Sequence, residues 1–428
     1  MSNKPTLVSR QILVSFILVT SLFALWGFAN DITNPMVRAF SKVLLMNNFQ
    51  GSLIQFAFYG GYFAMAFVAA YFIKRFGYKS GIVIGLALYA SGAFLFYPSS
   101  LGTSFWPFLV SYFILTCGLS FLETSANPYI LSMGDAETAT QRLNLSQSFN
   151  PIGSLIGMFT AQQLILARLN EAPFEERFAL READPQIFYA LQAHDLKVIR
   201  DPYVAIGTVV LVMMIVFLLV KMPNVKADSQ PLNVKATFQR LLSNASYREG
   251  VVAQFFYVGV QIMCWTFIIH YAEMELGISN QVAQLYNIAA MCIFCCSRFV
   301  CTYLLRFVNA GKLLQILALC GVMLVCGVVF VKGIFGLYCL VAISACMSLM
   351  FPTIYGLALK NVGHDTEFGA AGLIMSIVGG SILPPLQALM IDQPTICGLS
   401  GVRFSFVLPF VCFVVIAVYG YRSHKIFS

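Results

Sequence analysis

The chain has 428 residues, of which 59% are hydrophobic and only 10% are charged, whereas an average soluble protein carries about 25% charged residues. This composition excludes a water-exposed surface over most of the chain, and it also excludes a disordered, collagenous or coiled-coil protein. The formal net charge of +8 is therefore expected to face anionic lipid, and no nucleic-acid partner is expected.

Apolar segments follow one another along the whole chain. A helix needs about 20 mostly apolar residues to cross a bilayer, so roughly 250 hydrophobic residues would supply about twelve such helices. Pro35 predicts a kink or an end in the first span, whose apolar stretch is too long for a cleaved signal peptide. The predicted spans are residues 12–38, 50–73, 80–97, 105–133, 144–167, 203–221, 249–272, 281–305, 312–331, 335–359, 368–390 and 402–421.

Basic residues are distributed unevenly between the two sides that these spans define. With a cytoplasmic N-terminus, sixteen Lys and Arg residues lie inside and nine outside, and five of the nine fall in one loop, residues 168–202. Because positive residues favour the cytoplasmic side, both termini are predicted to be cytoplasmic, with the chain in the inner membrane of a bacterial cell. The loop also holds seven acidic residues and is predicted to be a solvated, partly helical outer loop.

A basic segment near the middle of the chain divides the predicted spans into six and six. This pattern is typical of two parallel six-helix repeats. It predicts an N-terminal half (residues 1–221), a central cytoplasmic linker (222–248) and a C-terminal half (249–428). The predicted fold class is an all-α membrane protein with twelve transmembrane helices in two pseudo-symmetric six-helix bundles.

Two acidic residues lie inside predicted spans. Of the eighteen acids, sixteen fall in loops or at helix ends, and the exceptions are Asp31 in the first span and Glu123 in the fourth. A charged side chain at the bilayer centre costs about 2.5–3.5 kcal/mol and normally faces a cavity or a partner. A carboxylate in such a cavity can take up and release a proton near neutral pH. We predict proton coupling at both residues; the alternative is a structural hydrogen bond between helices.

Neutral amides accompany these acids at helical spacing. Asn34 is i+3 from Asp31, Asn127 is i+4 from Glu123, and an aromatic and amide stripe follows the seventh span. Amides, carboxylates and aromatic rings together suit a polyhydroxylated ligand, although single amides often only join membrane helices. The predicted substrate-binding residues are Glu123, Asn127, Asn34, Asn144, Gln147, Asn150, Gln261, Trp265 and Asn287.

Motifs of other chemistries are not found in the sequence. The four histidines are scattered, the twelve cysteines lie mostly in apolar spans as packing residues, and no phosphate loop, GxSxG or HExxH occurs. We therefore expect neither an enzyme nor ATP-driven transport, no metal and no cofactor besides the proton as coupling ion. A monomer in the lipid bilayer with a small sugar as its partner is expected.

Five segments resemble a known family: NFQGSLIQFAFYGGYF (48–63), FLETSANPYI (121–130), RLNLSQSFNPIG (142–153), AQFFYVGVQIMCW (253–265) and FPTIYGLALKNVG (351–363). They are similar to those of the L-fucose–proton symporter family of the major facilitator superfamily. The resemblance implies a central cavity between two halves and proton-coupled monosaccharide uptake by alternating access. It implies that Glu123 serves in sugar recognition and proton coupling, and that Asn144 and Gln147 line the cavity.

The first span departs from the family pattern. The family carries its acid at the position of Asn34 and an amide at the position of Asp31, whereas here the two types are exchanged. Either Asp31 takes over the proton role or coupling rests on Glu123 alone, and galactose, glucose or another hexose becomes an alternative to L-fucose. A sodium-coupled carrier, a drug or organic-anion exporter and a non-transport membrane protein are the remaining alternatives.

Overall fold

The computed structural model describes residues 7–46, 48–102, 104–170, 172–223, 233–396 and 398–427. Within these ranges, eleven helical segments are long and apolar enough to cross a membrane. The predicted fifth span is helical too, but it is broken into shorter pieces over residues 139–165. Together they account for twelve spans, and the predicted all-α fold with twelve transmembrane helices is confirmed.

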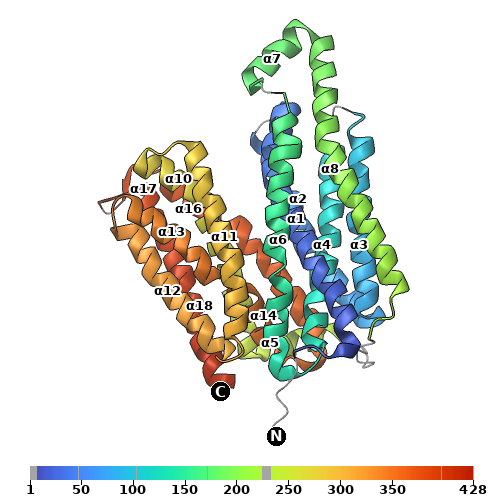
Figure 1. Ribbon diagram of the computed structural model, residues 1–428, viewed down its shortest axis with the longest axis vertical. Helices are drawn as coiled ribbons and strands as arrows, with labels where there is room; N and C mark the ends of the chain where they lie inside the picture. Colours follow the sequence, from blue (N-terminus) through green and yellow to red (C-terminus); the bar gives the residue numbers. More distant parts are fainter. Residues whose placement is uncertain are drawn as a thin grey trace. The chain divides into compact units, whose positions relative to one another are not determined.

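The chain forms two compact units, each described here by itself. The first, the N-terminal unit, comprises residues 11–129 and 149–227. In it α1 packs along α6 and α3 along α8 (Figure 1). Its elements are α1 (Leu13–Val43), α2 (Asn48–Phe76), α3 (Tyr78–Ser99), α4 (Trp106–Ser132, whose last turn belongs to the other unit), α6 (Asn150–Thr160), the π-helix η3 (Ala161–Ile165), the 3-10 helix η4 (Leu166–Arg168), α7 (Phe174–Ala183) and α8 (Pro185–Leu219).

The C-terminal unit comprises residues 1–10, 130–148 and 228–428. Within it α12 packs on α18 and α13, α10 contacts α16 and α18, and α5 packs against α11 and α14. Its helices are α5 (Ala139–Gln147), α9 (Val234–Ser243), α10 (Ala245–Leu276), α11 (Asn280–Leu304), α12 (Ala310–Phe330), α13 (Ile334–Met347), α14 (Met350–Leu359), α15 (Thr366–Met375), α16 (Gly379–Ile391), α17 (Gly401–Ser405) and α18 (Val407–Phe427). Short elements complete the chain: η1 (Arg10–Ile12), η2 (Ala136–Thr138), η5 (Gly363–Asp365), η6 (Ser376–Val378) and the antiparallel pair β1 (Thr395–Ile396) and β2 (Leu399–Ser400).

Two helices differ from the sequence prediction in an informative way. α1 continues beyond Pro35 to Val43, so an end of the first helix at the proline is wrong. α8 begins at Pro185, well before the predicted sixth span, because Asp184 accepts hydrogen bonds from the amides of Gln186 and Ile187 and proline suits the first helical turn. The predicted outer loop is therefore partly helical, as expected.

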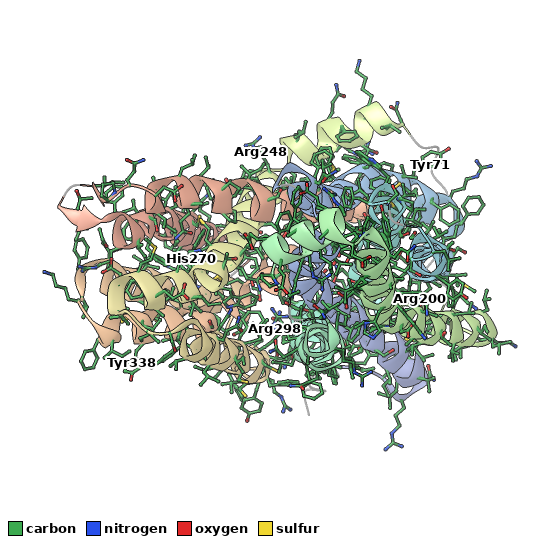
Figure 2. All side chains as sticks on the ribbon, turned by 90° about the horizontal axis from the view of Figure 1, so that it is seen from above. Tyr71, Arg200, Arg248, His270, Arg298 and Tyr338 are labelled. Carbon is green, nitrogen blue, oxygen red and sulfur yellow. The ribbon has the colours of Figure 1, made fainter. Side chains whose placement is uncertain are left out.

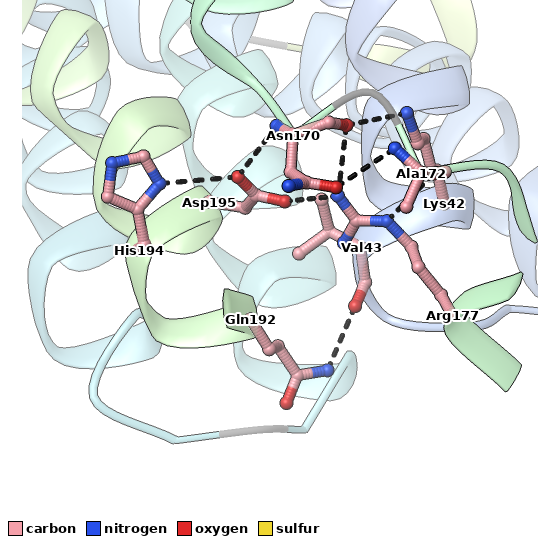
Figure 3. A network of polar contacts seen from close by, with 8 residues as sticks. All are labelled: Lys42, Val43, Asn170, Ala172, Arg177, Gln192, His194 and Asp195. Atoms are coloured by element: carbon pink, nitrogen blue, oxygen red, sulfur yellow. Dashed lines mark hydrogen bonds and ion pairs between the residues drawn. The ribbon is translucent and has the colours of Figure 1, made fainter. Parts of the chain in front are cut away.

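The same outer segment is mostly exposed, as predicted, but it contains a buried ion pair. The Arg177 guanidinium forms an ion pair with Asp195, and both side chains are 0% exposed. Arg177 also donates through Nε to the Ala172 carbonyl, at 3.1 Å, while Asp195 accepts from the amide of Asn170, at 3.1 Å (Figure 3). Burial of two charges is tolerated here because each meets the other and further hydrogen bonds.

Side chains also attach the outer segment to the end of α1. Lys42 donates from Nζ to the Asn170 carbonyl at 2.7 Å, and Gln192 donates from Nε2 to the Val43 carbonyl at 2.9 Å (Figure 3). The outer segment and the last turn of α1 thus form one hydrogen-bonded structure.

Four of the predicted spans are broken helices. The fifth is divided between α5 and α6, the tenth between α13 and α14, the eleventh by the 3-10 turn η6, and the twelfth between α17 and α18. Pro151 lies in the first turn of α6 and Pro352 in the first turn of α14. Proline has no amide hydrogen to continue the preceding helix, which explains the first two breaks.

Candidate functional site

Glu123 lies on α4 and is only 5% exposed. Its Oε1 accepts a hydrogen bond of 2.8 Å from the hydroxyl of Tyr62 on α2, which is also buried. The predicted intramembrane carboxyl group is therefore held by a neutral donor. Such a donor stabilises the ionised form without supplying a compensating charge.

Asp31 lies on α1 and is partly buried. Its carboxyl group lies near the side chain of Ser154 on α6 and near Tyr59 on α2. The Ser154 hydroxyl donates to the carbonyl of Gly27, at 3.4 Å. The acid thus faces the contact between α1 and α6, where hydroxyl groups are its partners.

One face of α2 places a tyrosine near each of the two acids, Asp31 and Glu123. Tyr59 and Tyr62 are separated by three residues, so they project from the same side of the helix and interact with each other electrostatically. Tyr62 contacts Glu123, and Tyr59 lies near Asp31. Asp31 and Glu123 thus each lie near a tyrosine of the same face of α2.

Two predicted amides of the N-terminal unit hold backbone carbonyls. Asn127 is buried and donates from Nδ2 to the carbonyl of Glu123 at 3.0 Å. Asn150 donates from Nδ2 to the carbonyl of Phe23 at 3.2 Å, joining α6 to α1. The side chain of Asn34 lies outside the described residues. Sugar binding by these three residues stays a prediction.

The C-terminal unit contains the amides of α5. Asn144 is buried and donates from Nδ2 to the carbonyl of Thr140, at 2.9 Å, and to the hydroxyl of Thr353 on α14, at 3.1 Å. Its Oδ1 is buried without a hydrogen-bond partner. Gln147 is buried at the end of α5. Asn144 therefore retains an acceptor for a hydroxyl group.

The aromatic part of the predicted site lies on α10. Trp265 is partly buried, donates from Nε1 to the hydroxyl of Ser344 at 3.2 Å and meets the ring of Phe294 edge-on at 4.9 Å. Gln261 on α10 and Asn287 on α11 are also partly buried. Trp265 is thus fixed in orientation, as a ring that packs on a sugar needs to be.

The predicted residues divide between the two units. The N-terminal unit contains Asp31, Glu123, Asn34, Asn127 and Asn150, and the C-terminal unit contains Asn144, Gln147, Gln261, Trp265 and Asn287. Among the described residues, no group of three His, Cys, Asp or Glu side chains is placed to hold a metal ion.

Sequence reasoning missed the hydroxyl partners of the acids, which are Tyr62, Tyr59 and Ser154. Their residue types are common in membrane helices and carry no charge, so they do not stand out. A usable signal was available for the tyrosines, because a phenolic hydroxyl in an apolar span needs a hydrogen-bond partner.

Comparison with known proteins decides the family. The family model of the Major Facilitator Superfamily matches residues 13–384. The chain belongs to the major facilitator superfamily.

Several superfamily members are similar to it over nearly their whole length. The L-fucose-proton symporter of Haemophilus influenzae is 52% identical over 425 residues, with 98% of each chain covered. The L-fucose-proton symporter of Escherichia coli is 34% identical, with 97% of this chain and 94% of that protein covered. The glucose/galactose transporter of Brucella abortus is 31% identical, with 95% and 93% covered.

A solved structure of a superfamily member agrees with the fold. The crystal structure of a major facilitator superfamily transporter, FucP, in the outward conformation matches with a TM-score of 0.88 at 34% identity. The match covers 97% of this chain and 99% of that one. The resemblance to the L-fucose–proton symporter family is therefore confirmed, and the chain is a multi-pass membrane transporter of the superfamily.

Proposed function

We propose that this superfamily member carries L-fucose into a bacterial cell together with a proton. The observation that carries the proposal is the pair of intramembrane carboxyl groups, Asp31 and Glu123, each beside hydroxyl partners. The full-length similarity to two proteins named L-fucose-proton symporters supports the same function. Relatives that are transporters by name argue against an enzyme.

The transport cycle follows from alternating access. Asp31 and Glu123 take up a proton from outside, and the neutral site binds the sugar through amide and carboxyl hydrogen bonds, with Trp265 packing on the ring. The two six-helix halves then rock about the site. The proton leaves to the cytoplasm and the sugar follows. An inward proton gains about 2.3 kcal/mol per 100 mV, enough to concentrate a neutral sugar roughly fiftyfold.

The setting of this cycle is also proposed. The halves are residues 1–221 and 249–428, joined by a cytoplasmic linker, and both termini face the cytoplasm of a cell whose inner membrane holds the protein as a monomer. The excess of Lys and Arg in the predicted inner loops supports this orientation. No cofactor is needed besides the proton, because the proton gradient supplies the free energy.

Uptake in membrane vesicles tests the proposal. Labelled L-fucose should accumulate when an inward proton gradient is imposed, and a protonophore should abolish the accumulation. A sodium gradient at constant pH should have no effect. Accumulation that follows sodium and ignores pH, or the failure of L-fucose to accumulate under either gradient, would contradict the proposal.

A hexose such as galactose or glucose is the second candidate substrate. The specific observation is the exchanged pair Asp31 and Asn34, together with the similarity to a protein named glucose/galactose transporter. Uptake of labelled L-fucose challenged with excess galactose, glucose and arabinose distinguishes the two. Competition by galactose or glucose at lower concentration than unlabelled L-fucose favours the second candidate.

A further inference from the structure

At two positions, a proline stands where a backbone amide would otherwise donate a helical hydrogen bond to a carbonyl. In a continuous helix the carbonyl of residue i accepts from the amide of residue i+4. The partners of Gln147 and Ser348 would be residues 151 and 352, and both are proline. An unsatisfied carbonyl inside a membrane is costly, so each break calls for a replacement donor.

A single side chain, Arg298 on α11, supplies both replacements. Its Nη1 donates to the Gln147 carbonyl at 2.9 Å and its Nε donates to the Ser348 carbonyl at 2.5 Å. The guanidinium is 3% exposed (Arg298 is labelled in Figure 2). The planar fork of arginine can hold two acceptors at fixed directions, which lysine cannot. One residue therefore joins the fifth, eighth and tenth spans.

Neighbouring groups hold this guanidinium in place. It lies over the ring of Phe294 at 4.6 Å, and Phe294 meets Trp265 edge-on. Tyr257 on α10 lies near Arg298 and donates to the Met347 carbonyl, at 3.1 Å, in the same break of the tenth span. Arg298 thus connects the two breaks to the aromatic group predicted to bind the sugar.

Arg298 is held by neutral groups. The ion pairs found among the described residues do not include it. A buried ion pair is strongly destabilised when its partner leaves, because an unpaired charge stays behind. A guanidinium on carbonyls can exchange a carbonyl for water more readily. The contact is therefore suited to be broken and remade.

Side-chain hydrogen bonds attach α5 and the residue after it to α11 and α14. Gln141 donates to the carbonyl of Thr302 at 3.2 Å, Ser148 lies 3.4 Å from the Thr302 hydroxyl, and Asn144 contacts Thr353. The boundary between the two compact units falls in the chain directly after Ser148. The segment that Arg298 holds therefore ends where the chain passes from one unit to the other.

We propose that Arg298 is a positioning residue that holds α5 on α11 and α14 in this conformation and releases the Gln147 carbonyl when the transporter changes state. The proposal rests on the alternating-access function proposed above. The release of the Gln147 carbonyl, together with the hydrogen bonds of Gln141, Asn144 and Ser148, frees α5, while the Ser348 contact stays within the C-terminal half. Arg298 thereby sets the balance between the two states of the carrier.

Thiol labelling tests this role. Ser148→Cys places a reporter in the contact that Arg298 supports, and residues 143–168 contain no other cysteine, so mass spectrometry can assign the label. A membrane-impermeant maleimide is applied to right-side-out and inside-out vesicles, with and without Arg298→Gln. We expect the Arg298→Gln change to raise labelling at position 148 at least tenfold in vesicles of one orientation. Arg306→Gln, at an exposed position after the same helix, should leave it unchanged.

Internal controls separate release from unfolding. Cys264 is fully buried in α10 and should stay unlabelled in every variant that is folded. If Arg298→Gln does not fold, Arg298→Lys keeps the charge but can hold only one carbonyl well, and it should raise labelling in a folded protein. Equal labelling with and without Arg298 in folded protein overturns the proposal. The labelling needs no sugar, so its outcome is independent of whether L-fucose proves to be the substrate.

Discussion

The hydroxyl of Tyr62 donates a 2.8 Å hydrogen bond to the carboxyl group of Glu123, and both side chains are buried. The bond crosses from α2 to α4, so it fixes the carboxyl group between two helices. A donor on a carboxylate favours its ionised form. Tyr62 is therefore expected to control how readily Glu123 gives up its proton. In the proposed cycle, the loss of this proton to the cytoplasm precedes the release of the sugar.

Tyr62→Phe should shift the pH profile of transport toward alkaline pH. The variant loses a hydrogen bond to a charged group, worth about 1.5–3 kcal/mol, so Glu123 holds its proton to higher pH. We expect the alkaline limb of L-fucose counterflow to move up by about one pH unit. Counterflow in vesicles buffered at equal pH on both sides measures the shift. Tyr71→Phe, exposed on the same helix, is the control, and coincident profiles for the two variants would refute the role of Tyr62.

Glu123→Gln should separate sugar exchange from accumulation. The amide keeps the shape of the side chain and can still accept from Tyr62, but it carries no titratable proton. We expect counterflow of L-fucose to persist and concentrative uptake under a proton gradient to fall at least tenfold. Glu137→Gln, outside the membrane spans in η2, should leave both activities intact. Full concentrative uptake by Glu123→Gln would show that its proton role is wrong.

Asp31→Asn tests whether the acid of the first span carries the coupling. If Asp31 replaces the family acid, the single variant loses concentrative uptake. The double variant Asp31→Asn, Asn34→Asp restores the family order of amide and acid and should recover it in part. Uptake under an imposed pH gradient compares the three proteins at equal expression. Unchanged uptake by Asp31→Asn would leave Glu123 as the coupling residue by itself.

Some of the site could be predicted because acidic residues are rare inside membrane spans. A carboxyl group stands out in an apolar span, so Asp31 and Glu123 were identifiable from the sequence. Their partners could not be identified, because Tyr62 lies 61 residues from Glu123 and register between helices is set by packing. The prolines at 151 and 352 predict carbonyls without donors, but only the structure identifies Arg298 as the donor for both.

Charge counting predicted the mostly exposed outer segment but did not reveal its buried ion pair. The mixture of acids and bases in residues 168–202 predicts a solvated loop, because charged residues are rarely buried unless they are paired. Composition does not reveal pairing, and Arg177 and Asp195 lie eighteen positions apart. The helix α7 brings them together, and their burial follows from a tertiary contact with no local sequence signal.

Arg177→Ala should therefore destabilise the protein more than its surface-like sequence suggests. The change leaves the Asp195 carboxylate buried without its partner, and breaking a buried pair from one side costs about 3–5 kcal/mol. Thermal unfolding of detergent-solubilised protein should begin at lower temperature, with the outer segment opening first in hydrogen exchange. Arg181→Ala removes an exposed arginine of the same helix and should change neither measurement. Replacing both partners, as in Arg177→Met with Asp195→Leu, removes the unpaired charge and should recover much of the loss. A single variant as stable as Arg181→Ala would mean that the buried pair does not hold the outer segment.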